Sequence, residues 1–193
     1  MSSNSFFTSN REKALWIYTL IILVGIFLSL IIGRPFLELF KNQELQGGVF
    51  LLGMVIIGIC IVLYGIVSKP KIVEFILILG IITVYILLFL RLGLPERSHL
   101  IEYSTLSLTI HHALIERKKQ GKKIPHLSLY ALMLACSIGV IDEIIQIFIP
   151  KRVFDPNDIM FNCLAALLAI GFSAGLQALK RKLEKKNSTQ QSV

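Results

Sequence analysis

Six apolar segments, each long enough to cross a membrane as a helix, constrain this chain more than any other feature. They contain 18 to 23 residues each, and about 20 residues of helix cross a hydrocarbon core roughly 30 Å thick. A helix satisfies its own backbone hydrogen bonds in lipid, whereas an open strand does not. We therefore predict an all-α fold, a polytopic membrane helical bundle with about six transmembrane helices. The predicted spans are residues 15–32, 49–67, 72–90, 98–115, 127–149 and 159–179.

The composition also indicates a membrane protein. Hydrophobic residues make up 54% of the 193 residues, and the net charge is +8. The basic residues lie between and beyond the apolar segments, not on one face of a folded domain, so we expect no nucleic-acid partner. The connections are short, which predicts a single membrane domain over residues 1–193. We expect a multi-pass protein of the cell membrane, with membrane lipid as a partner.

The distribution of lysine and arginine predicts the orientation, because cytoplasmic loops carry an excess of both. If the N-terminus is cytoplasmic, 14 of the 20 basic residues lie inside. The six that lie outside are Arg34, Lys41, Arg91, Arg97, Lys151 and Arg152. We therefore expect both termini in the cytoplasm and an even number of spans.

Three polar clusters interrupt this apolar pattern, and under the predicted topology all three lie toward the outer side of the membrane. Charged groups at membrane depth are costly, so they usually face a bundle interior, a cavity or a partner. The first cluster is Arg97, Ser98, His99 and Glu102. The second is Asp142, Glu143 and Gln146, and the third is Lys151, Arg152, Asp155, Asp158 and Asn162.

The residue types in these clusters are those of acid–base catalysis, metal ligation and phosphate binding. The candidates for catalysis are Asp142, Glu143, His99 and Glu102. The candidates for ligand binding are Gln146, Arg152, Asp158, Asn162 and Arg97. In the structural alternative, Asp142 and Glu143 pair with Arg152 or Arg97, and Asp158 caps a helix. The identity of any metal or cofactor stays open, as does the question whether the protein is an enzyme.

Helical spacing predicts which faces of two segments point into the bundle. In the fourth segment, polar residues recur three and four apart at Ser98, Glu102, Thr105, Thr109 and His112. In the sixth, small residues that allow close helix packing follow the polar ones at Ala165, Ala166, Ala169 and Ser173. We expect both faces to be buried.

The order and spacing of these motifs resemble the VanZ-like family of bacterial membrane proteins. The matching pattern is His99-x-x-x-Tyr103-x-x-Leu106, then Asp142-Glu143-x-x-Gln146, then Arg152, Asp158 and Asn162. It covers a core of about residues 85–175 and leaves two additional N-terminal helices within 15–67. One departure is Ala165, which stands where the family pattern tends to have glycine, three residues after the asparagine.

The resemblance implies a setting in the bacterial cell envelope, because the family's founding member is associated with reduced sensitivity to teicoplanin-type glycopeptide antibiotics. A lipid-linked cell-wall precursor or a glycopeptide would then be the partner of an outward-facing polar site. The alternative is a membrane enzyme acting on a phosphorylated lipid or lipid-linked precursor, because carboxylates, histidine and arginine also suit phosphoryl chemistry. A proton-coupled transporter ranks last, since the first three segments are nearly free of polar residues.

Overall fold

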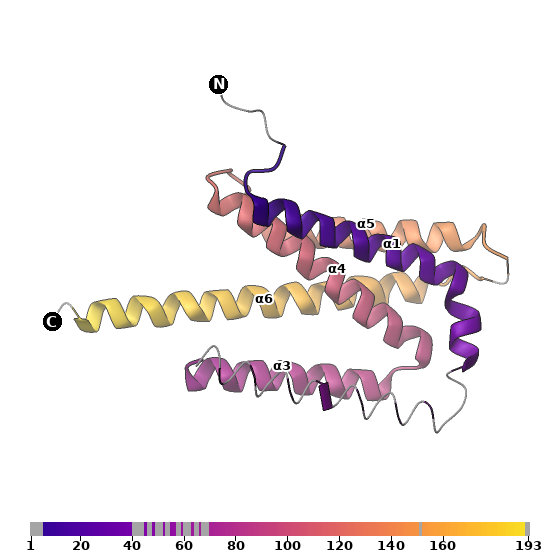
Figure 1. Cartoon of the computed structure of the whole chain (residues 1–193), viewed down its shortest axis with the longest axis horizontal. Helices are drawn as coiled ribbons and strands as arrows, with labels where there is room; N and C mark the ends of the chain where they lie inside the picture. The colour runs from indigo at the N-terminus through magenta and orange to yellow at the C-terminus, as the bar shows by residue number, and fades with distance from the viewer. Residues whose placement is uncertain are drawn as a thin grey trace. The chain divides into compact units, whose positions relative to one another are not determined.

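The computed structural model is built from α-helices. It describes residues 6–39, isolated positions between 45 and 66, and residues 70–150 and 152–191. The helices are α1 (Asn10–Leu39), α3 (Ile72–Arg91), α4 (Leu94–Lys119), α5 (Leu127–Gln146) and α6 (Pro156–Gln191), as labelled in Figure 1. These described ranges contain no β-strand, so the predicted all-α fold is confirmed.

The helices belong to two compact units. The first contains Met1–Ile31 and Leu92–Gly175, and the second contains Ile32–Arg91 and Leu176–Val193. Helices α1 and α6 therefore contribute to both. All the candidate site residues lie in the first unit, which is built from the first part of α1, all of α4 and α5, and the first part of α6.

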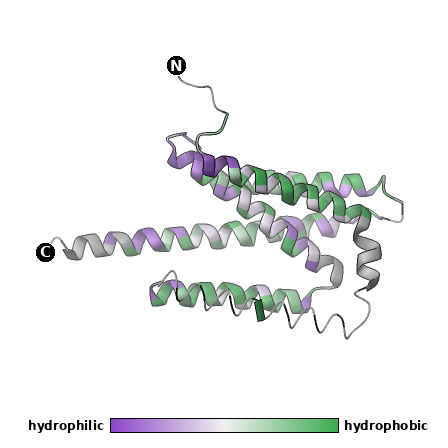
Figure 2. Ribbon diagram, viewed as in Figure 1, coloured by the Kyte–Doolittle hydropathy of each residue, from purple (hydrophilic) through white to green (hydrophobic). Residues whose placement is uncertain are grey.

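Four helical segments of the described chain are long and apolar enough to cross a membrane (Figure 2). They are Asn10–Ile31, Ile72–Arg91, Leu127–Gln146 and Pro156–Leu183, which correspond to the first, third, fifth and sixth predicted spans. The predicted span 49–67 falls mostly outside the described residues. The predicted span 98–115 is helical, as part of α4, but it is too polar to be counted with the other four. The total of six spans and the cytoplasmic location of both termini stay predictions.

Helix α4 tolerates this polarity because other helices of its unit enclose it. Its most deeply buried residues include Tyr103, Leu106, Ser107, Ile110 and Ala113. The imidazole of His111 forms hydrogen bonds with Ser128 on α5 (3.1 Å) and Ser173 on α6 (3.2 Å). A polar side chain that finds partners on neighbouring helices need not face lipid.

A second set of contacts attaches α4 to α1. At the C-terminal end of α4, Arg117 Nη1 donates to the Glu12 carboxylate of α1 at 3.3 Å. Glu12 also accepts hydrogen bonds from the backbone and the hydroxyl of Thr8, which precedes the helix. The buried charge of Glu12 is therefore fully paired.

The polar stripe predicted for α4 is wrong, because the buried polar face lies about one residue further round the helix. Ser98, Thr105 and His112 are exposed. The buried polar residues on α4 include His99, Ser104, Ser107 and His111. Thr105 and Thr109 do not require interhelical partners, because their hydroxyls donate to carbonyls of their own helix, at 2.7 Å to Ile101 and 2.8 Å to Leu106.

Helices α4, α5 and α6 approach one another closely at Gly139. A Cβ atom added there would lie 3.0 Å from Asn162 Cβ on α6 and 3.3 Å from Tyr103 Cε1 on α4. The small-residue face predicted for α6 is buried, at Ala165, Ala166, Ala169 and Ser173. That prediction is confirmed, and the close packing brings the polar ends of the three helices together.

Candidate functional site

The buried face of α5 leads from small residues into the polar cluster. Its buried residues are Ala131, Ala135, Gly139, Asp142, Glu143 and Gln146. Asp142 is 1% exposed and Glu143 is fully buried. Both carboxyl groups therefore point into the helix bundle, which is the arrangement expected for acidic residues inside a membrane helix.

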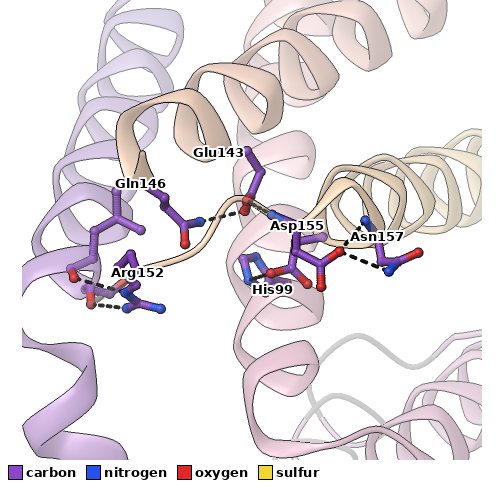
Figure 3. A network of polar contacts seen from close by, with 9 residues as sticks. His99, Glu143, Gln146, Arg152, Asp155 and Asn157 are labelled. Atoms are coloured by element: carbon purple, nitrogen blue, oxygen red, sulfur yellow. Dashed lines mark hydrogen bonds and ion pairs between the residues drawn. The ribbon is translucent and has the colours of Figure 1, made fainter. Parts of the chain in front are cut away.

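The Glu143 carboxylate is held from two directions (Figure 3). Its Oε1 accepts a hydrogen bond of 2.6 Å from Gln146 Nε2, one turn later on α5. Its Oε2 accepts the backbone N–H of Asp155 at 3.2 Å. The second bond attaches the connection between α5 and α6 to the carboxylate.

Asp155 also sets the start of α6. Its side-chain oxygen accepts both the backbone N–H and the side-chain amide of Asn157, each at 2.9 Å (Figure 3). Together with Pro156 at the first helical position, this is an N-cap arrangement. The structural alternative that made Asp158 the cap is therefore wrong, because Asp158 lies in the first turn of the helix.

From this first turn, Asp158 reaches across to α4. Its Oδ2 lies 3.5 Å from His99 Nε2. The imidazole of His99 stacks on the ring of Tyr103 from the next turn, with 6.2 Å between ring centroids and 28° between planes. Packing thus fixes the orientation of the imidazole relative to α6.

Three side chains from three helices converge at this point. His99 of α4, Glu143 of α5 and Asp158 of α6 each offer one donor atom, and the three atoms lie within 4.8 Å of one another. Their common depth under the predicted topology had predicted that these residues would lie in one polar site. The structure brings them together.

Arg152 lies in the same region but has other partners. Its Nε donates to the carbonyl of Leu30 (3.3 Å) and its Nη2 to the carbonyl of Ser29 (3.2 Å), both on α1 (Figure 3). The described part of the chain shows no ion pair between Arg152 and a carboxylate. Arg152 therefore fastens the α5–α6 connection to α1 and acts on Asp142 electrostatically, without the direct ion pair that the structural alternative describes.

Several buried polar atoms near these residues have no hydrogen-bond partner. They are His99 Nδ1, Tyr103 Oη, Asp142 Oδ1, and both side-chain polar atoms of Asn162. Tyr103 and Asn162 both face Gly139, one turn before Asp142 on α5. A buried polar group without a partner is costly, and five such atoms in one region indicate a place that binds a polar ligand, water or an ion.

The remaining two candidates, Glu102 and Arg97, have contacts of their own. Glu102 interacts with Ser29 of α1 and lies within electrostatic range of Asp142 and Arg152. Arg97 donates from Nε to the carbonyl of Leu92 at 2.9 Å, which supports the turn before α4. Their predicted roles in catalysis and ligand binding stay predictions.

Sequence reasoning missed the part that α1 plays in this region. Ser29 and Leu30 contribute backbone carbonyls, which leave no trace in a pattern of side chains. Gly139 was also missed, although a signal existed. It is the single glycine in the segment 127–149 and lies three residues before Asp142, where a missing side chain lets helices approach.

Comparison with known proteins identifies the family. A family model described as VanZ/LLP1 matches residues 15–177, a wider range than the motifs on which the resemblance was based. No curated protein and no solved structure has a significant match. The matched range includes every residue of the polar cluster and most of the described helices. The chain therefore belongs to the VanZ/LLP1 family, as the order of its polar motifs predicted, and is a membrane protein with several apolar helices.

Proposed function

We propose that this protein is a multi-pass protein of the bacterial plasma membrane that lowers the sensitivity of the cell to teicoplanin-type glycopeptide antibiotics. Family membership supports this proposal, because the founding member of the VanZ-like family is associated with that phenotype. The excess of basic residues in the predicted cytoplasmic segments supports an outward-facing position for the polar cluster.

The observation that carries the proposal is the group of buried polar atoms without partners around Asp142. Such atoms need a hydrogen-bonding ligand, and the cluster lies at one end of α5 and the beginning of α6, near a membrane surface if these helices cross the bilayer. A lipid-linked cell-wall precursor or the glycopeptide itself offers the hydroxyl, amide and anionic groups that match. Binding either one would change how the antibiotic meets its target.

The test is antibiotic tolerance in a susceptible bacterium that expresses the full chain. We expect the wild-type protein to raise the minimal inhibitory concentration of teicoplanin and not that of an unrelated cell-wall antibiotic. The Asp142→Asn variant should reach the same membrane level and give no protection. His112→Ala, which changes an exposed residue of α4, is the matched control and should protect fully.

Two results would overturn this assignment. One is an unchanged teicoplanin sensitivity when the wild-type protein is present in the membrane at a verified level. The other is full protection by Asp142→Asn, which would separate the phenotype from the polar cluster.

A further inference from the structure

We infer that His99, Glu143 and Asp158 form a binding site for a divalent transition-metal cation of the Zn²⁺ or Mn²⁺ type. The inference concerns the same polar cluster as the proposed function but rests on its geometry, not on antibiotic tolerance. The three residues come from α4, α5 and α6, so a bound cation would also join the three helices.

The distance between His99 and Asp158 fits two metal ligands better than a direct ion pair. A charge-assisted N–H···O hydrogen bond is about 2.7–2.9 Å long, whereas His99 Nε2 and Asp158 Oδ2 are 3.5 Å apart. Two ligands about 2.1 Å from a zinc ion, at a tetrahedral angle, are about 3.4 Å from each other. The observed separation is therefore close to that of two ligands sharing one ion.

The third donor is near enough to complete the site. All three donor atoms lie within 4.8 Å of one another, and opposite ligands of a small octahedral cation are about 4.2 Å apart. From 4.8 Å, a movement of about 0.6 Å reaches the spacing of opposite octahedral ligands and one of about 1.4 Å the tetrahedral spacing. One imidazole nitrogen with two carboxylate oxygens is a donor set that suits Zn²⁺ and Mn²⁺.

Neighbouring residues hold the side chains of the proposed metal ligands Glu143 and His99 in fixed orientations. Gln146 and the Asp155 backbone hold the two oxygens of Glu143, and the Tyr103 ring holds the plane of His99. Such contacts orient the ligands of a metal and tune their affinity. Asp142 Oδ1, which is buried without a partner, is available to a water molecule bound to the cation.

The charge of the cluster gives an independent reason for a cation. Asp142, Glu143 and Asp158 are three carboxyl groups that act on one another electrostatically. Arg152 acts on Asp142 electrostatically, but its hydrogen bonds are to carbonyls of α1. Negative charge concentrated in a largely buried site is costly, and a divalent cation between Glu143 and Asp158 would lower that cost.

The experiment measures metal binding by the purified full chain in detergent, after removal of metal with a chelator. Zn²⁺ and Mn²⁺ are added separately, and the bound ions per chain and the melting temperature are determined. Mn²⁺ is the more selective probe, because it prefers oxygen and imidazole donors to the thiols of Cys136 and Cys163. We expect one ion per chain and an increase in melting temperature.

Variants then assign the site. His99→Ala and Asp158→Asn should abolish binding, and Gln146→Leu should weaken it about 10–100-fold, as loss of a supporting hydrogen bond does in other metal sites. His112→Ala should bind like the wild type. The melting temperature without metal reports whether each variant is folded, and either ligand variant suffices if the other fails to fold.

Wild-type protein that binds neither ion, or folded His99→Ala and Asp158→Asn variants that bind as tightly as wild type, would overturn the metal site. These outcomes are independent of the antibiotic assay. Metal binding without any effect on teicoplanin sensitivity would reject the proposed function alone, and tolerance in a protein that binds no metal would reject the metal site alone.

Discussion

The buried carboxylate of Glu143 accepts the backbone N–H of Asp155, twelve residues later in the chain, at 3.2 Å. This bond, with the one from Gln146, uses both oxygens of Glu143 to fix the connection between α5 and α6. Its neighbour Asp142 is equally buried, but Asp142 Oδ1 has no partner. Adjacent acidic residues therefore differ in their surroundings, since Glu143, a proposed metal ligand, is held by hydrogen bonds within the fold, whereas Asp142 Oδ1 has no partner in the chain.

This difference predicts opposite effects of two isosteric substitutions on stability. Glu143→Gln replaces an acceptor oxygen by an amide nitrogen and leaves one of the two donors unpaired, so we expect a loss of about 1–3 kcal/mol. Asp142→Asn removes a buried charge and breaks no hydrogen bond of Oδ1, so its stability should equal or exceed that of the wild type. Thermal unfolding of both variants in detergent provides the measurement. An equal loss in the two variants would contradict this difference between the carboxyl groups.

The close approach of three helices at Gly139 leads to a second prediction. Gly139→Ala would place a methyl group 3.0 Å from Asn162 Cβ, so Asn162 must give way by a few tenths of an ångström, and we expect this crowding to cost about 1–3 kcal/mol. The control is Gly25→Ala in α1, where nothing lies within 4 Å of the added atom. There alanine should stabilise the helix by about 0.5–1 kcal/mol, because its backbone loses less conformational entropy on folding than that of glycine. Melting temperatures that fall equally in both variants would show that Gly139 is not a special contact.

The contacts of Arg152 with α1 predict that lysine cannot replace it. Lysine keeps the charge but not the planar fork that reaches the Ser29 and Leu30 carbonyls together, so Arg152→Lys should cost about 1–3 kcal/mol. Arg181→Lys is the control, since Arg181 donates to a carbonyl of its own helix from an exposed position and should have little effect. If Arg152→Lys melts at the wild-type temperature, the connection between α5 and α6 is not held to α1 by this side chain.

The sequence predicted which side chains meet in the polar cluster better than it predicted their contacts with the backbone. His99, Glu143 and Asp158 were predicted to meet because charged groups in apolar segments must find one another, and helix periodicity with a common depth was enough to place them. The contacts of Arg152 could not be predicted, because its partners are backbone carbonyls of Ser29 and Leu30. The stripe on α4 was misplaced because Thr105 and Thr109 bond to their own helix, so a hydroxyl alone does not mark an inward face.

The final prediction concerns orientation, on which access to the polar cluster depends. The loop that follows α4 carries Arg117, Lys118, Lys119, Lys122 and Lys123, and such loops remain in the cytoplasm. In a background with all three cysteines replaced by alanine, a Gln120→Cys variant should therefore resist a membrane-impermeant maleimide in intact cells. A Phe154→Cys variant, placed in the connection between α5 and α6, should react. Gln120→Cys should become reactive only after permeabilisation, which serves as the control for accessibility.

The reverse labelling would put Glu143 and Asp158 on the cytoplasmic side. A cell-surface precursor or an external antibiotic could not reach them there, whereas the proposed metal site would be unaffected.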